Sequence, residues 1–139
     1  MIGNNPYSPK LLAWSKTPSH RGIGLTHPNL RGLAHNRNCG DKIFIKFLVT
    51  NDVIQHAEFD GESCAISQAS SQALCEYLEG KHISNIYEVI SALRKLILEG
   101  SIGGVEGYLD DFRVLHPYPS RHKCALLIVD AIENALGHD

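Results

Sequence analysis

The 139-residue sequence lacks any long apolar run and any block of like charges. No stretch of about 18 apolar residues is present, so we expect no transmembrane helix and no membrane partner. Lys and Arg total 13 against 15 Asp and Glu, which leaves no basic excess to neutralise phosphates. We therefore expect no nucleic-acid partner. The first residues also lack the charged and apolar regions of a secretory signal, which predicts a cytoplasmic protein.

Cysteine is scarce as well, with four residues and no CxxC pair. In a reducing cytoplasm, four cysteines are better explained as ligands, nucleophiles or buried apolar residues than as two disulfides. Hydrophobic residues make up 43% of the chain and charged residues 20%, as in an ordinary globular domain. The length suits one domain over residues 1–139, large enough to bury a core without disulfides.

The strand signals are concentrated in the first half of the sequence. Residues 42–60 show the apolar alternation of a β-hairpin, with a turn at Asn51 and Asp52. A preceding strand is expected somewhere in 24–36. On the returning strand, one face is expected to carry Val53, Gln55, Ala57 and Phe59.

Helical spacing dominates the second half. Apolar residues recur at helical intervals over 66–77, 86–97 and 125–136, and a short helix is expected near residues 9–14. Strands followed by helices indicate an α+β domain. We expect a small antiparallel three-stranded sheet with helices packed on one face.

Three cysteines and one aspartate lie at the boundaries of the expected elements. Cys39 and Asp41 share a loop before the first clear strand, Cys64 precedes a helix, and Cys124 lies in the first turn of the last helix. A helix N-terminus stabilises a thiolate, and three thiolates with one carboxylate complete a tetrahedron around Zn²⁺. Spacing alone leaves an alternative open. Cys39 and Asp41 could be ordinary loop residues, and Cys64 and Cys124 could be buried cysteines at helix starts.

The segments that carry these residues resemble the motifs of NifU/IscU/SufU-type iron–sulfur cluster assembly proteins. Residues 38–43 resemble the family's CGD segment, and residues 59–71 look like its G-x-x-C-x-I-S-x-A-S run. Residues 121–125 are similar to the third motif, in which a cysteine opens the last helix. The residue before the last cysteine is Lys123, whereas the IscU type has histidine at this position. In this feature the chain is similar to the SufU type. The resemblance covers nearly the whole chain and implies a SufE/NifU-like fold in a single NifU N-terminal-like domain.

The resemblance also implies a function and a role for each residue. The implied zinc ligands are Cys39, Asp41, Cys64 and Cys124. Cys39 is the implied sulfur acceptor: a histidine of a pyridoxal-phosphate-dependent cysteine desulfurase replaces it on zinc, and its thiolate attacks the enzyme persulfide. Arg121 matches a position that the family uses to contact the desulfurase. Lys123 is expected to bind the partner as well.

The implied protein is a sulfurtransferase-like partner of the desulfurase that passes sulfur to downstream iron–sulfur assembly proteins. The alternative is a scaffold that assembles and releases a [2Fe–2S] cluster on the same ligands. Two neighbouring residues are left out of the site. Cys75 matches no motif and is expected to pack in a helix. His122 is two positions from Cys124, and residues two apart on a helix point in different directions.

Overall fold

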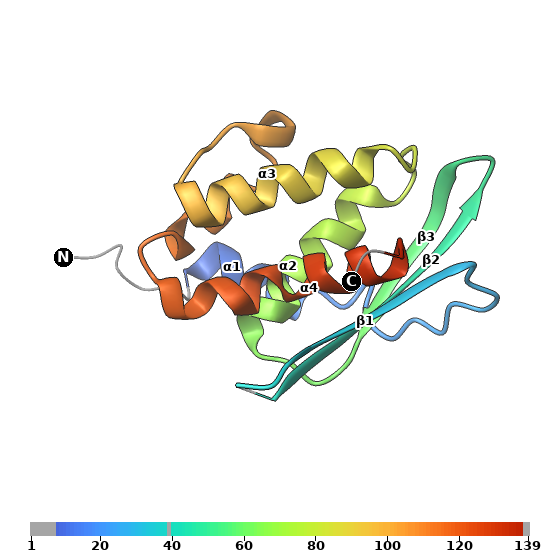
Figure 1. Ribbon diagram of the computed structural model, residues 1–139, viewed down its shortest axis with the longest axis horizontal. Helices are drawn as coiled ribbons and strands as arrows, with labels where there is room; N and C mark the ends of the chain where they lie inside the picture. The colour runs from blue at the N-terminus through green and yellow to red at the C-terminus, as the bar shows by residue number, and fades with distance from the viewer. Residues whose placement is uncertain (1–7, 39, 138–139) are drawn as a thin grey trace.

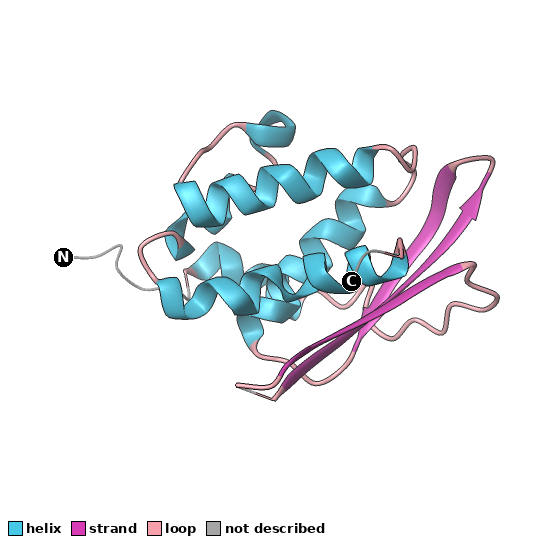
Figure 2. Cartoon of the chain, viewed as in Figure 1, coloured by secondary structure: helices cyan, strands magenta, loops and turns pink. Residues whose placement is uncertain are grey.

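The computed structural model describes residues 8–38 and 40–137. Three antiparallel strands form one sheet in the order β1-β2-β3, and the helices pack on one of its faces (Figure 2). Helices α2 and α4 lie against the sheet, and α3 packs on them on the side away from it (Figure 1). The expected α+β fold is confirmed. The elements are α1 (Pro9–Lys16), β1 (Leu30–Asn36), β2 (Asp41–Thr50), β3 (Val53–Asp60), α2 (Ala65–Leu78), α3 (Asn85–Glu99), the 3₁₀ helices η1 (Gly104–Gly107), η2 (Asp110–Leu115) and η3 (Pro119–Arg121), and α4 (His122–Ala135).

The predicted hairpin is formed by β2 and β3. Thr50 pairs with Val53, so a two-residue turn joins the strands. Both turn residues are left-handed, with φ of 52° at Asn51 and 64° at Asp52. This backbone matches the twist of the strands, and Asn and Asp tolerate it better than other residues with a Cβ. The weakly signalled preceding strand is β1, which pairs antiparallel with β2.

The face predicted for the returning strand is wrong in its first half. Leu48 pairs with His56 and Val49 with Ile54, so Gln55 has no partner in the register and forms a β-bulge. The extra residue reverses the alternation. As a result Ile54 is buried and Gln55 is exposed, whereas the predicted inward positions Ala57 and Phe59 are correct.

The four predicted helices are confirmed, and each begins where the sequence indicates. Helix α1 starts at Pro9, and the Ser8 hydroxyl accepts a hydrogen bond from the amide of Leu11. Helix α3 ends at Gly100, which is left-handed with φ of 74°. Within the described residues, no helix is both long and apolar enough to cross a membrane.

The chain between α3 and α4 forms the three short 3₁₀ helices, over which the sequence shows no clear periodicity. Phe112 and Leu115 of this stretch are buried in the core. Val105 and Glu106 are left-handed, with φ of 46° and 59°. Such local geometry does not repeat a period and is therefore hard to recognise in a sequence.

One close backbone approach fixes α4 against the sheet. A Cβ on Gly32 of β1 would overlap the carbonyl oxygen of Ala131 and crowd Ala135. Only glycine allows strand and helix to meet at this distance. The contact brings the second half of α4 close to β1.

Candidate metal centre

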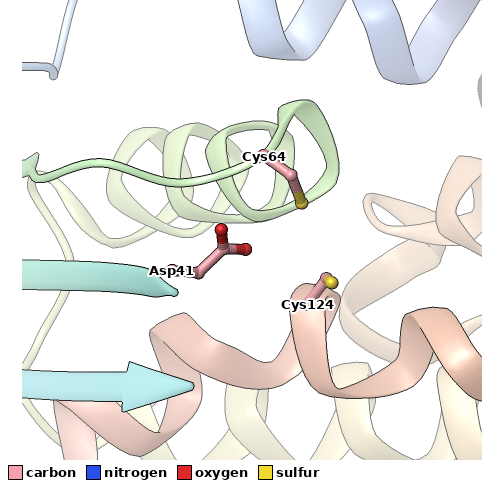
Figure 3. A group of neighbouring side chains, drawn as sticks. All are labelled: Asp41, Cys64 and Cys124. Atoms are coloured by element: carbon pink, nitrogen blue, oxygen red, sulfur yellow. The ribbon is translucent and has the colours of Figure 1, made fainter. Parts of the chain in front are cut away.

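Three of the four predicted ligands meet at one end of the domain. One ligand atom each from Asp41, Cys64 and Cys124 lies within 4.8 Å of the others. Figure 3 shows the three side chains pointing toward one another from the start of β2, the start of α2 and the first turn of α4. Asp41 and Cys124 are buried, and Cys64 is partly buried.

The position of Cys64 depends on the way the chain leaves β3. Gly61 is left-handed with φ of 126°, and a Cβ there would overlap the carbonyl oxygen of Lys42. The amide of Lys42 donates a 2.8 Å hydrogen bond to the carbonyl of Glu62. These contacts hold residues 61–64 against the beginning of β2. Cys64 then caps the N-terminus of α2 beside Asp41.

The structure favours the thiolate form of Cys64 in the metal-free protein. A hydrogen bond from the Cys124 thiol contributes most to lowering the pKa of Cys64 to about 6, and the backbone and hydroxyl of Ser67 add to it. Burial and the charge of Asp41 act in the opposite direction. The thiol of Cys64 is therefore largely deprotonated at neutral pH and already prepared to bind a metal.

This pKa predicts how the metal-free protein reacts with iodoacetamide. Because the thiolate is the reactive form, the alkylation rate of Cys64 is expected to rise with pH around a midpoint near 6 instead of 9.0. Mass spectrometry of the peptide that carries Cys64 measures the rate. Cys75 is the internal reference, because burial raises its pKa and keeps it unmodified. A Cys64 midpoint near that of an ordinary thiol would contradict the lowered pKa of Cys64.

The remaining predicted site residues are placed as follows. Cys39 lies outside the described residues, and its neighbours Asn38 and Gly40 belong to the turn that joins β1 to β2. Arg121 is partly buried at the start of α4. Lys123 is exposed and borders a pocket that is also lined by His35, Asn36, Arg37, Asn38, Leu127 and Asp130. Both cations therefore stand close to Cys124 in the chain.

The two residues left out of the site are engaged elsewhere. Cys75 is buried in the core on α2. His122 places its Nε2 at 3.1 Å from the carbonyl oxygen of Leu115 and 3.0 Å from that of His116. Its ring thus satisfies the carbonyls at the end of η2.

The donor set fits a zinc ion. Zn–S bonds of about 2.3 Å and Zn–O bonds of about 2.1 Å place two ligands of one tetrahedral ion roughly 3.6–3.8 Å apart. The observed separations, all within 4.8 Å, need side-chain shifts of about 1 Å or a little more. Thiolates are ligands that zinc prefers, and a carboxylate is a harder and weaker member of the set. Asp41, Cys64 and Cys124 would hold the ion and leave one position for a further ligand.

Sequence reasoning missed Ser67, which touches all three residues. Its hydroxyl lies 3.2 Å from Oδ2 of Asp41, 2.8 Å from the carbonyl oxygen of Cys124 and 3.6 Å from Sγ of Cys64. The available signal was a set of serines, Ser67, Ser70 and Ser71, on the apolar side of a helix. All three are fully buried, where a hydroxyl needs a partner.

Comparison with known proteins agrees with this geometry. Residues 6–100 match the model of the NifU-like N-terminal domain. The chain is 28% identical over 139 residues to the Thermotoga maritima iron–sulfur cluster assembly scaffold protein IscU, covering 98% of this chain and 96% of that protein. It is 27% identical to the zinc-dependent sulfurtransferase SufU of Bacillus subtilis, covering 89% and 84% of the two chains.

A solved structure shows the same fold. The crystal structure of a protein described as an iron–sulfur cluster assembly scaffold for the SUF system, from Fervidobacterium islandicum, superposes with a TM-score of 0.84. The two sequences are 30% identical, and the match covers 94% of this chain and 96% of that one. The chain therefore belongs to the NifU-like N-terminal domain family, the IscU and SufU type of iron–sulfur cluster assembly protein.

Proposed function

We propose that the chain is a zinc-dependent sulfur acceptor that activates a cysteine desulfurase by taking persulfide sulfur on Cys39. The observation that carries the proposal is the convergence of Asp41, Cys64 and Cys124 within 4.8 Å. Cys39 lies two residues before Asp41 in the sequence and would complete a set of three thiolates and one carboxylate. The relative from Bacillus subtilis named a zinc-dependent sulfurtransferase supports this choice.

The proposed roles of the four ligands differ. Asp41, Cys64 and Cys124 stand at the starts of β2, α2 and α4, where the packed elements hold them. Cys39 belongs to the segment between β1 and β2 and is the thiol we expect to exchange. Bound zinc would keep its thiolate ligands deprotonated near neutral pH.

The sulfur transfer itself is a thiol exchange. The thiolate of Cys39 attacks the outer sulfur of the enzyme persulfide, the S–S bond of the donor breaks, and the enzyme thiolate leaves. Cys39 then carries the new persulfide. One S–S bond replaces another, so the step consumes no oxidant. We propose that Arg121 and Lys123, at the start of α4, contact the desulfurase, and that downstream assembly proteins receive the sulfur.

Desulfurase turnover tests this proposal. Adding the protein to a cognate desulfurase with cysteine and a reductant is expected to increase turnover, because Cys39 removes the persulfide from the enzyme. Cys39→Ala is expected to return turnover to that of the enzyme alone, while circular dichroism still shows a folded protein. Cys75→Ala is the matched control and should stimulate like the unmodified chain.

The outcomes separate the sulfur acceptor from a purely structural zinc domain. A structural site predicts that Cys39→Ala unfolds the protein, since every ligand then supports the fold. If the unmodified protein does not increase the turnover of its cognate desulfurase with reductant present, the proposal is wrong.

A second candidate is a scaffold that assembles and releases a [2Fe–2S] cluster. The Thermotoga maritima relative, named a scaffold protein, supports it with an alignment over 98% of this chain. Thiolates are the usual ligands of such clusters. Tight zinc after aerobic purification favours the sulfur acceptor. An anaerobically built cluster that transfers to an apo-acceptor faster than it decays favours the scaffold.

A further inference from the structure

Ser67 lies at the centre of the three converging residues, but it is not a predicted ligand. It occupies the first turn of α2, and its side chain is fully buried. Its hydroxyl is within 3.2 Å of Oδ2 of Asp41 and 2.8 Å of the carbonyl oxygen of Cys124. One small polar group therefore links the starts of β2, α2 and α4.

The hydroxyl of Ser67 is held by burial and by its own contacts with Asp41 and Cys124. The hydroxyls of Ser70 and Ser71 donate to the backbone carbonyl oxygen of Ser67, at 3.2 Å and 2.7 Å, and not to its side chain. Both serines are themselves fully buried. Buried side chains with satisfied hydrogen bonds keep one rotamer, so Ser67 presents its hydroxyl at a defined point.

The hydroxyl has one proton and more than one acceptor. It can donate to the carboxylate of Asp41 or to the carbonyl of Cys124, and Sγ of Cys64 lies 3.6 Å from the same oxygen. A carboxylate is the stronger acceptor because its hydrogen bond is charge-assisted. Among the carboxylate oxygens, only Oδ2 has this contact with Ser67 in the described structure.

We propose that Ser67 is a positioning residue that engages Oδ2 of Asp41 and makes the aspartate bind a metal through one oxygen only. The inference rests on the proposed metal centre at Asp41, Cys64 and Cys124 and adds how its coordination number is set. With one oxygen from Asp41, the four ligands give a four-coordinate site. Without the hydroxyl, both carboxylate oxygens are available and a fifth coordination position is filled.

This role has a consequence for metal choice. Four-coordinate sites rich in thiolate suit Zn²⁺, whereas a carboxylate that offers both oxygens moves a site toward harder cations with higher coordination numbers. Partners that orient a metal ligand typically change metal affinity by about 10- to 100-fold when removed. Ser67→Ala is expected to weaken zinc binding within that range.

Cobalt(II) is the probe for the coordination number, because tetrahedral Co²⁺ absorbs visible light far more strongly than five-coordinate Co²⁺. The full-length protein is loaded with Co²⁺, and zinc affinity is measured in parallel by competition with a chelator. Ser67→Ala is expected to lower the visible bands and weaken zinc binding. Ser71→Ala is the matched control, since it removes a buried hydroxyl from the same helix. Within the described residues, that hydroxyl donates to the backbone carbonyl of Ser67 and is hydrogen-bonded to none of the proposed ligands. It should keep both properties.

A second measurement does not depend on any variant's folding. The splitting between the two carboxylate stretches of Asp41, isolated by infrared difference spectra of loaded and metal-free protein, distinguishes one-oxygen from two-oxygen coordination. We expect the wide splitting of one-oxygen binding in the unmodified chain.

Ser67→Thr keeps the hydroxyl and, where it folds, is expected to restore the four-coordinate cobalt spectrum that the alanine variant loses.

The results separate this inference from the proposed function. If the unmodified protein shows the tetrahedral spectrum and Ser67→Ala shows the same spectrum and affinity, the role of Ser67 is overturned while the metal centre stands. A narrow carboxylate splitting in the unmodified protein overturns it as well. If the unmodified protein binds neither Co²⁺ nor Zn²⁺, the metal centre itself is wrong.

Discussion

Cys64→Ser is expected to weaken zinc binding by roughly a hundredfold. Structural zinc sites bind with about 10–16 kcal/mol in total, so one of four ligands accounts for about 3 kcal/mol, or roughly a hundredfold in affinity. Serine does not ionise at neutral pH and replaces a thiolate that the structure already favours. Elemental analysis of the purified protein, with chelator competition for the residual affinity, measures the loss.

Cys75→Ala is the matched control for this experiment. Cys75 lies on α2, the helix that begins directly after Cys64, but it is buried in the core. Its replacement is expected to lower stability modestly and to leave one zinc per chain. Zinc binding by Cys64→Ser as tight as that of the unmodified protein would show that this thiol is not a ligand.

Gly61→Ala is expected to destabilise the metal-free protein by about 3 kcal/mol or more. A left-handed backbone costs alanine about 1–2 kcal/mol, and forcing a methyl group into packed atoms costs about 1–3 kcal/mol. Both apply here, because φ is 126° and the Cβ overlaps the carbonyl oxygen of Lys42. Urea unfolding measures the free energy. Zinc affinity should fall too, since Cys64 is displaced from Asp41.

Gly80→Ala separates the two contributions. Gly80 is left-handed with φ of 87°, but no atom lies within 4 Å of a Cβ there. Its substitution is expected to cost only the backbone strain of about 1–2 kcal/mol and to leave zinc affinity unchanged. Equal losses of unfolding free energy in the two variants would mean that the close approach of Gly61 to Lys42 adds nothing to the cost of the substitution.

The elements of this fold were predictable because their signals are local. Alternation over 42–60 and the Asn51–Asp52 turn define the hairpin, and the turn residues are of the kind that tolerates the observed positive φ. Helical spacing and flanking glycines defined the helices, including the end of α3 at Gly100. The bulge at Gln55 was not predictable, because an unpaired residue leaves the local composition unchanged.

The site was less predictable from residue patterns, because its geometry is not local. The positions of Cys64 and Cys124 at helix starts are visible in the sequence, but their meeting depends on contacts between distant segments, such as the close approach of Gly61 to Lys42. No periodicity encodes such contacts. The residue pattern left a shared site and unrelated cysteines as alternatives, and the family resemblance favoured the shared site. Ser67 was missed for a related reason. A serine in a helix shows its role only when its buried neighbours are known.

The three proposed ligands, at the starts of β2, α2 and α4, have a consequence for the protein's lifetime. An ion held by all three binds the folded chain, because unfolding separates the donors. An ion present at a hundred times its dissociation constant adds about 2.7 kcal/mol to the stability of the folded state. The emptied chain therefore opens roughly a hundredfold more often, and proteases act on the opened state. With the proposed site, metal supply would govern how long each copy of the protein survives.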